Sequence, residues 1–578
     1  MKKNTLMLML LLFCYVTAYS TTFYVDNING NDTNNDGLSW STALKSLTGA
    51  IAKAKTAPYD VTVDDIFVKG GNYPTGSKIS ADLDNLYGGF EGIEINISQR
   101  PLEDKDGNGI IEPWEFKFPS KITSTFDATG SSAVAVSNTT NSYKNTFNGF
   151  TITQTGTVRP NDNTKTYQVI KMMSSNAILE NVTIHNCNVQ FPSIPTTSLN
   201  GVIIDVIAGA VKNCLVEKNT VYVGFASGAT TTLGPIVQIQ KGTIDGCVFR
   251  NNKVTFQAVG AASSALATYS VQGAVISIKT ATTGTDVTMN NTLIYNNEAL
   301  YDNNSANITG NQWAATAYNG ALIKMGYVGT PPVASDSIVG CVIANNKLTN
   351  MGGSTLYANS SATKFTNVIN NVLWNNKNEL GDKNLQTLST FATGLNIGWV
   401  INNAYTSGGP ANTVNGWIGN NLIDLNALNA DAKGPNFKAP TIFQGVNRTA
   451  GSADSIAIAH ANWGLNLGSY LIAKGVALTT RTKDFLGNSF STPRSIGAYD
   501  YNGPSGFSDI RLKSDIVNAG IQKISCNTEG TISVFNTIGK LIFKNKVQQG
   551  EEIKIQSGLY LIFIQTSTGN YSQKIIIK

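Results

Sequence analysis

The segment DKDGNGIIEPWE, Asp104 to Glu115, concentrates side chains that could bind a metal ion. Carboxylate and amide oxygens recur along it at short intervals, and two glycines allow the backbone to turn sharply between them. The oxygen-bearing side chains are those of Asp104, Asp106, Asn108, Glu112 and Glu115. Because calcium takes six to eight hard oxygen ligands, this set predicts a calcium site. The alternative interpretation is an acidic surface turn.

The same segment resembles the calcium loop of EF-hand proteins. The resemblance places Gly109 at the sixth position, where that loop turns, and the apolar Ile111 at the eighth. It implies a bidentate role for Glu115 at the twelfth position and a backbone carbonyl ligand from Ile110 at the seventh. The remaining ligands that it implies are Asp104, Asp106, Asn108 and Glu112.

The surroundings of this segment depart from the EF-hand pattern. Pro113 lies inside the loop, and the flanking sequences SQRPLE and WEFKFP contain prolines that do not favour two long helices. A calcium sensor needs a pair of helices that open. We therefore expect a dockerin-like or inserted loop that serves as a structural calcium clip.

A repeated phrase dominates the chain from Phe147 to Ile423. The copies include LENVTIHNCN, VKNCLVEKNT, IDGCVFRNNK, MNNTLIYNNE and IVGCVIANNK. Their third residues fall at positions 149, 181, 213, 246, 291, 340, 370 and 402, a spacing typical of a stacked array. Each copy has a short β-type run that cannot bury its apolar face alone, so the units must stack.

The columns of these copies indicate which face is interior. The fourth and sixth residues are mostly apolar and share the parity of one strand face, which we assign to the core. The ninth residues include Asn219, Asn252, Asn297, Asn346 and Asn376, which predict an asparagine ladder at a strand spacing of about 4.8 Å. These features resemble the right-handed parallel β-helix of the pectin-lyase-like superfamily. An amphipathic helix from about Ser41 to Ala54, capped by Ser41 or Thr42, is expected to cover its open end.

The seventh column is the one place where the repeat suggests catalysis. It should face outward and carries His185, Glu217, Arg250 and Tyr295. Lyases of this β-helix fold, such as chondroitinase-B-like enzymes, remove a proton next to a uronate with Lys or Arg, often with calcium. The strip could therefore bind or cleave an acidic polysaccharide. The alternative is a solvated outer face where any polar residue is allowed.

Other catalytic patterns are missing from the sequence. The chain has two histidines, and neither is accompanied by a G-x-S-x-G nucleophile motif. The paired Asp residues and Gly-His-Gly phrase of polygalacturonase-type hydrolases are also missing. Whether the protein is an enzyme stays open, and the missing motifs favour a protein that is not.

Composition and the N-terminus indicate the compartment. A net charge of +5 over 578 residues argues against nucleic-acid binding. Residues 1–20 have two lysines, an apolar run and small residues, the pattern of a secretory signal peptide, and no later run reaches transmembrane length. Five cysteines follow, and we interpret them as buried free thiols, with a Cys214–Cys247 bridge as the alternative.

The last residues change character. Short alternating strands after about residue 503 predict a small β-sandwich, and the phrases VFNTIGKLI, SGLYLIFI and KIIIK resemble the C-terminal sorting domain of type IX secretion cargo in Bacteroidota. We therefore expect a β-helix domain over 21–503, which includes the 104–115 loop, and a sorting domain over 504–578. The resemblance implies export by the type IX machinery, with the protein then released or attached to the outer surface.

Two functions remain open. The first is a secreted or cell-surface protein that binds glycans or surface components and holds a structural calcium ion. The second is a polysaccharide lyase or glycoside hydrolase that acts on acidic polysaccharide. The sequence leaves open which glycan or partner is bound and how many copies assemble.

Overall fold

The computed structural model describes most of the chain. The described residues are 20–56, 63–75, 78–82, 84–124, 134–137, 145–154, 156–158, 168–191, 199–225, 232–234, 236–258, 270–271, 273–280, 286–302, 322–327, 335–349, 354–359, 365–378, 386–388, 400–405, 419–420, 423–424, 435–479, 481–501, 511–512, 517–527, 529–536, 540–566 and 569–577. The predicted signal peptide, except Ser20, lies outside them. The chain divides into two compact units, Met1–Asp500 and Tyr501–Lys578.

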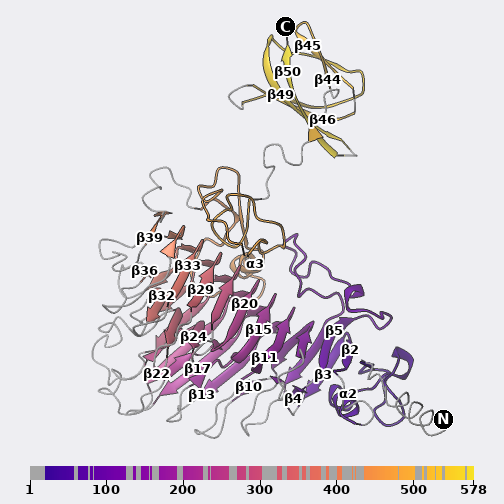
Figure 1. The fold of residues 1–578 in the computed structure, drawn as a ribbon, viewed down its shortest axis with the longest axis vertical. Coiled ribbons are helices and arrows are strands. Elements are labelled where there is room, and N and C mark those ends of the chain that lie inside the picture. Colours follow the sequence, from indigo (N-terminus) through magenta and orange to yellow (C-terminus); the bar gives the residue numbers. More distant parts are fainter. Residues whose placement is uncertain are drawn as a thin grey trace, which may run out of the picture. The chain divides into compact units, whose positions relative to one another are not determined.

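The first unit is a parallel β-helix, as the repeat predicted. Its strands stack as successive rungs from β1 to β39 (Figure 1). The largest sheet has 19 strands, and all its pairings are parallel: β1 (Thr22–Val25), β2 (Asp65–Lys69), β4 (Ile79–Asp82), β5 (Asn85–Phe90), β7 (Val134–Ser137), β8 (Asn145–Asn148), β11 (Ile170–Glu180), β15 (Ile204–Lys212), β19 (Val237–Ile239), β20 (Gly242–Asp245), β24 (Ile276–Thr280), β25 (Val287–Asn290), β28 (Ile323–Tyr327), β29 (Ser335–Val339), β32 (Ser354–Asn359), β33 (Phe365–Ile369), β36 (Gln386–Leu388), β37 (Val400–Ile401) and β39 (Gly419–Asn420).

Three further parallel sheets complete the coils. The sheet of 11 strands comprises β3 (Gly71–Thr75), β6 (Ser120–Ser124), β9 (Phe150–Gln154), β12 (Thr183–His185), β16 (Leu215–Glu217), β21 (Val248–Arg250), β26 (Leu293–Tyr295), β30 (Val342–Ala344), β34 (Val372–Trp374), β38 (Ala404–Tyr405) and β40 (Ile423–Asp424). The sheet of seven comprises β10 (Thr157–Val158), β13 (Asn188–Phe191), β17 (Thr220–Phe225), β22 (Lys253–Ala258), β27 (Glu298–Asp302), β31 (Lys347–Thr349) and β35 (Lys377–Asn378). The smallest comprises β14 (Leu199–Asn200), β18 (Thr232–Gly234) and β23 (Ser270–Val271).

Asparagine is the commonest residue at the two turns of the repeat copies, with glycine at three of the third positions and Lys218 at one of the eighth positions. Nearly all of these third and eighth residues adopt positive φ, as at Asn213 with φ 48° and Asn251 with φ 56°. Asparagine tolerates this left-handed conformation better than most residues because its short side chain bonds to local backbone groups. The two turns therefore bend the chain from the 19-stranded sheet into the 11-stranded sheet and then into the seven-stranded sheet.

The interior follows the predicted columns. The fourth and sixth residues of the copies are buried in one continuous hydrophobic core, for example Cys247 and Phe249 at 0% exposure. The ninth-column asparagines form the predicted ladder, with Asn252 Nδ2 donating to Asn297 Oδ1 at 2.9 Å and Asn297 Nδ2 donating to Asn346 Oδ1 at 3.0 Å. All five described cysteines are free and buried.

Helix α2 (Leu47–Ala54) covers the first coil, but it begins later than predicted. Its N-cap is Ser46, whose side chain accepts from the backbone of Gly49. Residues 40–42 instead form the 3-10 turn η1 (Trp40–Thr42), and Leu44 bridges to Val25 of β1. Pairing with β1 keeps the backbone extended there, so the helix starts only after it. The buried face of α2 joins the β-helix core.

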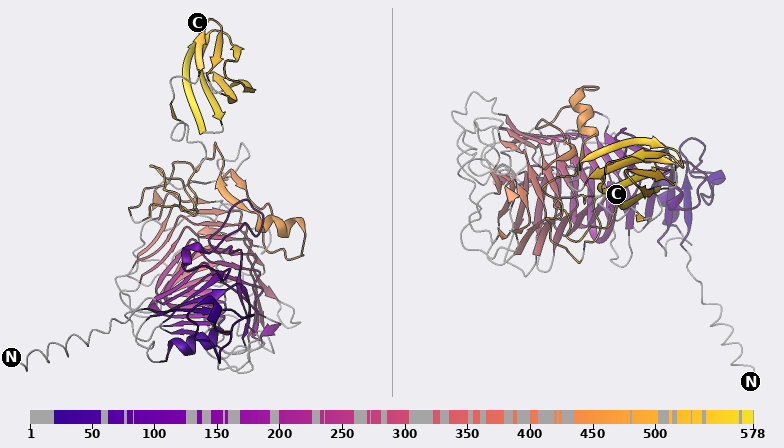
Figure 2. Two further views of the ribbon diagram at one scale, coloured as in Figure 1. Left: turned by 90° about the vertical axis from the view of Figure 1, so that its right-hand side faces the viewer. Right: turned by 90° about the horizontal axis from the view of Figure 1, so that it is seen from above.

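The segment 435–500 lies outside the repeat and has little regular structure. It runs back along the outer side of the stack and contains β41 (Phe437–Ala439), α3 (Ala453–Ala459) and β42 (Asn462–Leu465) (Figure 2). Turn asparagines of successive coils donate to its backbone: Asn345 to Thr441, Asn296 to Gly445 and Asn251 to Asn447. The turn side chains thus serve as a row of donors that holds this otherwise irregular segment.

The second unit has two sheets around a separate core. One contains β43 (Arg511–Leu512), β50 (Gly569–Ile577), β49 (Gly558–Thr566), β46 (Gly530–Asn536) and β47 (Leu541–Val547). The other contains β44 (Val517–Gly520), β45 (Lys523–Cys526) and β48 (Glu552–Lys554). Pairing is antiparallel except between β43 and β50, and residues of both sheets pack together, as expected for a small sandwich.

Candidate functional site

The Asp104–Glu115 loop is a tight turn closed by extended backbone. Leu102 and Phe116 form an antiparallel bridge at its base, and Glu103 N donates to Glu115 O at 3.0 Å. Gly109 has φ +81°, a conformation that favours glycine. The only helical element within 20 residues upstream is the short η2 (Ile97–Gln99). The loop is therefore not held between two helices, in agreement with its proline-containing flanks.

Three carboxylates converge in this loop. One oxygen from each of Asp104, Asp106 and Glu115 lies within 4.8 Å of the other two. Backbone N–H groups hold these anions in place. Asp104 accepts from the backbone of Gly107 at 2.7 Å and of Gly109 at 2.8 Å, and Glu115 Oε1 accepts from Lys105 N at 2.9 Å. The fold thus brings together three of the four predicted carboxylate ligands.

Glu112 sits beside the three carboxylates and is incompletely bonded. Its Oε1 accepts from Asn108 Nδ2 at 2.9 Å, while its Oε2 is buried and has no hydrogen-bond partner in the protein. Burial, and then the neighbouring carboxyls of Glu115 and Asp106, raise the pKa of Glu112 to about 8. Asn108 Oδ1 in turn accepts from Ile110 N at 2.6 Å. A buried carboxyl oxygen without a donor, next to three converging anions, fits a nearby cation.

Arg250 on β21 connects the loop to the β-helix. All three of its side-chain nitrogens are bonded. Nε donates to Glu217 Oε2 at 2.8 Å, Nη2 lies 3.4 Å from Asp106 Oδ2, and Nη1 donates to Tyr295 OH at 3.2 Å and Ala459 O at 2.9 Å. Burial opposes its charge, but Tyr295, Glu217 and Asp106 together raise the pKa of Arg250 above its usual value. The guanidinium is therefore a permanent, buried cation.

The seventh-column strip is in register but is not an open face. His185, Glu217, Arg250 and Tyr295 pair successively across β12, β16, β21 and β26, as predicted. The expectation of a solvated outer face is wrong for the last two, since Arg250 is 6% exposed and Tyr295 is 2% exposed. The 104–115 loop and the 435–500 segment cover this part of the sheet. A polysaccharide chain therefore has no access to Arg250.

The end of α3 also contacts the loop. His460 Nε2 bonds the backbone carbonyl of Asp106, and Tyr295 OH donates to Ile458 O at 3.1 Å. Next to these contacts, Trp463 packs against Tyr295 with ring centroids 5.2 Å apart. Loop, sheet and C-terminal segment thus form one continuous contact region.

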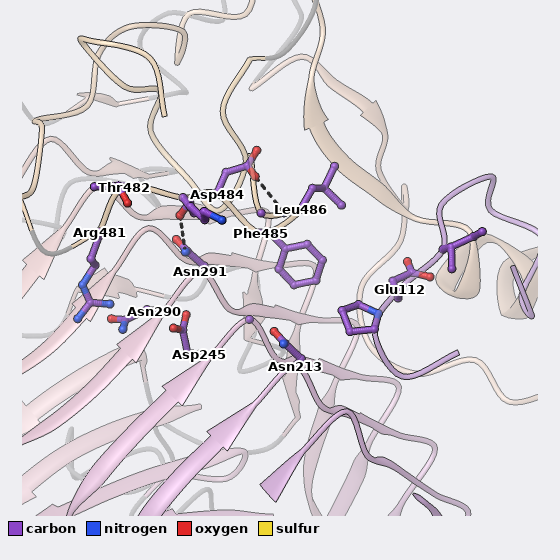
Figure 3. A pocket seen from close by; sticks show the side chains of 15 residues that line it. Glu112, Asn213, Asp245, Asn290, Asn291, Arg481, Thr482, Asp484, Phe485 and Leu486 are labelled. Atoms are coloured by element: carbon purple, nitrogen blue, oxygen red, sulfur yellow. Dashed lines mark hydrogen bonds between the residues drawn. The ribbon is translucent and has the colours of Figure 1, made fainter. Parts of the chain in front are cut away.

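A cavity of about 510 Å³ lies beside this region (Figure 3). Its walls come from the loop residues 111–113, from the first turn of three coils and from residues 481–487. In the view of Figure 3, Arg481, Asn290 and Asp245 gather at one end, Glu112 lies at the other, and the Phe485 ring lies between them. Burial raises the pKa of Asp245 and lowers the pKa of Arg481, and each charge opposes the shift of the other.

A separate polar row crosses the 19-stranded sheet on the side away from the core. Asp205, Gln238, Ser277 and Lys324 pair in register across β15, β19, β24 and β28 and are each at most 4% exposed. Burial raises the pKa of Asp205 to about 6, against the attraction of Lys171 and Lys279 and a hydrogen bond from Gln238.

Apart from residues 111–113, the residues that line the cavity were not predicted from the sequence. One signal was present in the copies: their second residues are Glu180, Lys212, Asp245 and Asn290 before the column turns apolar at Val339. These residues are the last ones of successive strands in the 19-stranded sheet, and they pair in register with one another. Arg481 gave no signal, because the segment that carries it has no repeat.

Comparison with known proteins supports the assignment of the tail. Residues 516–578 match the family described as secretion system C-terminal sorting domain. No curated protein and no solved structure matches the chain. Among the described residues, the structure contains no helix that is both long and apolar enough to cross a membrane. The chain therefore carries a type IX secretion sorting domain and is destined for the cell surface or the extracellular space.

Proposed function

We propose that the protein is a secreted or surface-attached β-helix protein that binds glycans without cleaving them, and that its 104–115 loop holds a structural calcium ion. The burial of Arg250 supports the non-catalytic part of this proposal. This arginine is the seventh-column residue with the chemistry of a lyase base, and every nitrogen of its side chain is bonded within the protein. Its contacts are those of a structural connection between loop and β-helix.

The loop residues fit a calcium ion. Asp104, Asp106 and Glu115 offer converging carboxylate oxygens, and Glu112 adds a buried oxygen that has no protein donor. Such hard oxygen donors suit calcium better than metals that prefer nitrogen or sulfur. A bound calcium ion supplies positive charge that offsets the mutual repulsion of these anions. Arg250 balances part of the charge of Asp106 from the other side.

The alternative is a polysaccharide lyase or glycoside hydrolase on the seventh-column strip. A lyase base must reach the proton it removes. Residues of α3 and the loop stand between Arg250 and solvent, and Glu217 is paired with the same arginine. The non-catalytic function is therefore the better supported one.

Calcium titration of the full mature chain tests the metal site. The melting temperature of the first unit should be several degrees higher in calcium than in EGTA. The reason is that a ligand present at a hundredfold its Kd stabilises a fold by about 2.7 kcal/mol. Glu115→Gln should remove this increment, and Glu91→Gln, an exposed change outside the loop, should keep it. An identical transition with and without calcium would contradict the site.

The same samples test the absence of catalysis. Incubation with a panel of acidic polysaccharides, in calcium and in EGTA, should give no unsaturated products by ultraviolet absorbance. Turnover that is lost in Arg250→Gln would overturn the non-catalytic assignment.

A further inference from the structure

The cavity lined by residues 111–113 and 481–487 has unpaired polar atoms in its walls. Among the described residues that line it, four side-chain atoms are buried and have no hydrogen-bond partner in the protein: Glu112 Oε2, Asn290 Oδ1, Asn291 Oδ1 and Arg481 Nη1. The side chains of Glu112, Asn290 and Asn291 are more than nine-tenths buried. Leaving such groups unpaired is costly. Their concentration in one cavity indicates a site built to bond something polar.

The chemistry of these atoms defines what fits. Three of the four are acceptors, so the ligand must bring donors, and Arg481 Nη1 needs an acceptor. Hydroxyl groups do both. Between the polar ends, Phe485, Leu486 and Ile111 give an apolar wall against which the carbon face of a ring can pack. The volume of about 510 Å³ lies in the range of ligand sites.

The charges in the cavity favour a neutral ligand. Two carboxylates, those of Asp245 and Asp484, are matched by two cations, those of Arg481 and Lys483, among the residues that line the cavity. The backbone N–H groups of Leu486 and Asn488 hold the Asp484 carboxylate in place without removing its charge. An anionic sugar would meet Asp245 and Asp484 without a surplus of cations. A purely apolar ligand would leave all four polar atoms unpaired.

We propose that this cavity binds a neutral sugar unit of a glycan, with the acceptors of Asn290 and Asn291 taking hydroxyl hydrogens, Arg481 donating to a ring or hydroxyl oxygen, and Phe485 packing against the sugar face. The assignment rests on the proposed glycan-binding function and names its site and ligand class. It differs from the seventh-column strip, which is covered. Binding here places the glycan next to the 104–115 loop, because Glu112 belongs to both.

Two substitutions remove the proposed ligand contacts. Asn290→Ala and Arg481→Ala each delete one polar atom that has no partner in the protein, Asn290 Oδ1 and Arg481 Nη1. Lys438→Ala, an exposed change in the same C-terminal segment but outside the cavity wall, is the matched control. Melting temperatures identify any variant that is destabilised, and Arg481→Lys then serves as the milder replacement.

The experiment measures binding of the full mature chain, in calcium, to oligomers of glucan, mannan, galactan and xylan and to uronate-containing and sulfated oligomers, by calorimetry. We expect binding to a neutral oligomer that weakens about tenfold in each cavity variant and not in the control. Equal affinity in wild type and cavity variants would overturn the site while the glycan-binding function stands. Binding confined to acidic oligomers would overturn the ligand class. Binding to no oligomer would overturn both proposals.

Discussion

Arg250 shows how one buried charge can join distant parts of a chain. Its guanidinium contacts Asp106 in the loop, Glu217 on the neighbouring coil and the backbone of Ala459 at the end of α3. A buried cation is tolerated only where its partners replace water. Each of these three chain segments therefore depends on the others for a completed set of bonds.

Replacement of Arg250 should be strongly destabilising. Arg250→Met leaves the partly buried Glu217 and Asp106 without their cation and removes a buried charge network, which costs about 3–5 kcal/mol. Chemical denaturation of the first unit measures the loss. Lys253→Met, which removes a half-exposed pairing with Glu298 at 3.9 Å, should cost less than about 1 kcal/mol. Similar losses in the two variants would contradict the role assigned to Arg250.

Asp205 should make stability depend on pH. Burial raises the pKa of its carboxyl to about 6, so the folded state binds a proton that the unfolded state has released. Asp205 therefore does not destabilise the fold below the pKa that it has in the unfolded chain. The free energy of unfolding then falls as the pH rises from about 4 to 6. The loss is on the order of 3 kcal/mol, because the pKa of Asp205 is about 6 in the folded state and close to its ordinary value of about 4 in the unfolded state.

Asp205→Asn tests this dependence. The substituted amide keeps an oxygen for Gln238 and does not titrate, so the variant should be more stable than wild type at pH 7 and similar to it at pH 4. Denaturation midpoints across that range measure the difference. Parallel pH profiles for the two proteins would exclude Asp205 as the source.

At the scale of the elements, asparagine has two roles in the repeat. In the eighth column it accepts the left-handed turn and donates to the 435–500 segment, as Asn296 does toward Gly445. In the ninth column it joins the buried ladder, where Asn297 bonds neighbours on both sides. The two roles explain why Asn-Asn recurs in the repeat.

Removing one rung of the ladder should be costly. Asn297→Ala leaves the amide of Asn252 and the carbonyl of Phe249 without their partner in the interior, and a loss of about 2–4 kcal/mol is expected. Asn186→Gly, at an exposed left-handed turn that glycine also adopts, is the control and should change stability by less than about 1 kcal/mol. Unfolding in guanidinium chloride measures the stability of both variants. Equal unfolding midpoints for the two would contradict a stabilising role of the asparagine ladder.

The repeat made the β-helix predictable from sequence. Each copy supplies its own turn residues and core columns, so the register across β16, β21 and β26 follows from the alignment of the copies. The same logic located the acidic loop, because its ligand spacing is local. Local patterns were less accurate for the start of α2. The helix was predicted to begin near Ser41, but Leu44 pairs with β1 instead of joining the helix.

The contacts between distant segments could not be predicted in this way. The 435–500 segment has no repeat and little regular structure, and turn amides of other coils hold it in place. Nothing in its sequence indicates that it would cover Arg250 or that Arg481 would line a cavity. Those facts depend on contacts across more than 200 residues, such as the one between Arg250 and Ala459.

At the scale of the whole molecule, the two units have separate tasks. Each has its own hydrophobic core, and the sorting-domain match lies within the second. The binding and metal sites proposed above lie entirely in the first. Export and binding should therefore be separable.

Deletion of Tyr501–Lys578 should block export without unfolding the first unit. The truncated chain lacks the domain that the type IX machinery handles, so it should stay inside the outer membrane, as cell fractionation would reveal. Its thermal transition should match the first transition of the full chain, because the core of the first unit is intact. Normal export of the truncated chain would show that the tail is dispensable for sorting.

The path of the 435–500 segment has a consequence for the order of folding. Early coils are made first, yet the bonds that complete them come from residues made much later: Arg448 donates to Asn219 O, 229 positions away, and His460 reaches Asp106 across 354. Closing such long loops is slow, because their entropy is lost before the contacts form. A partly synthesised chain can stack its coils, but Arg250 stays exposed to solvent until the 435–500 segment covers it. We expect these last contacts to form only in a chain that has been synthesised beyond residue 460.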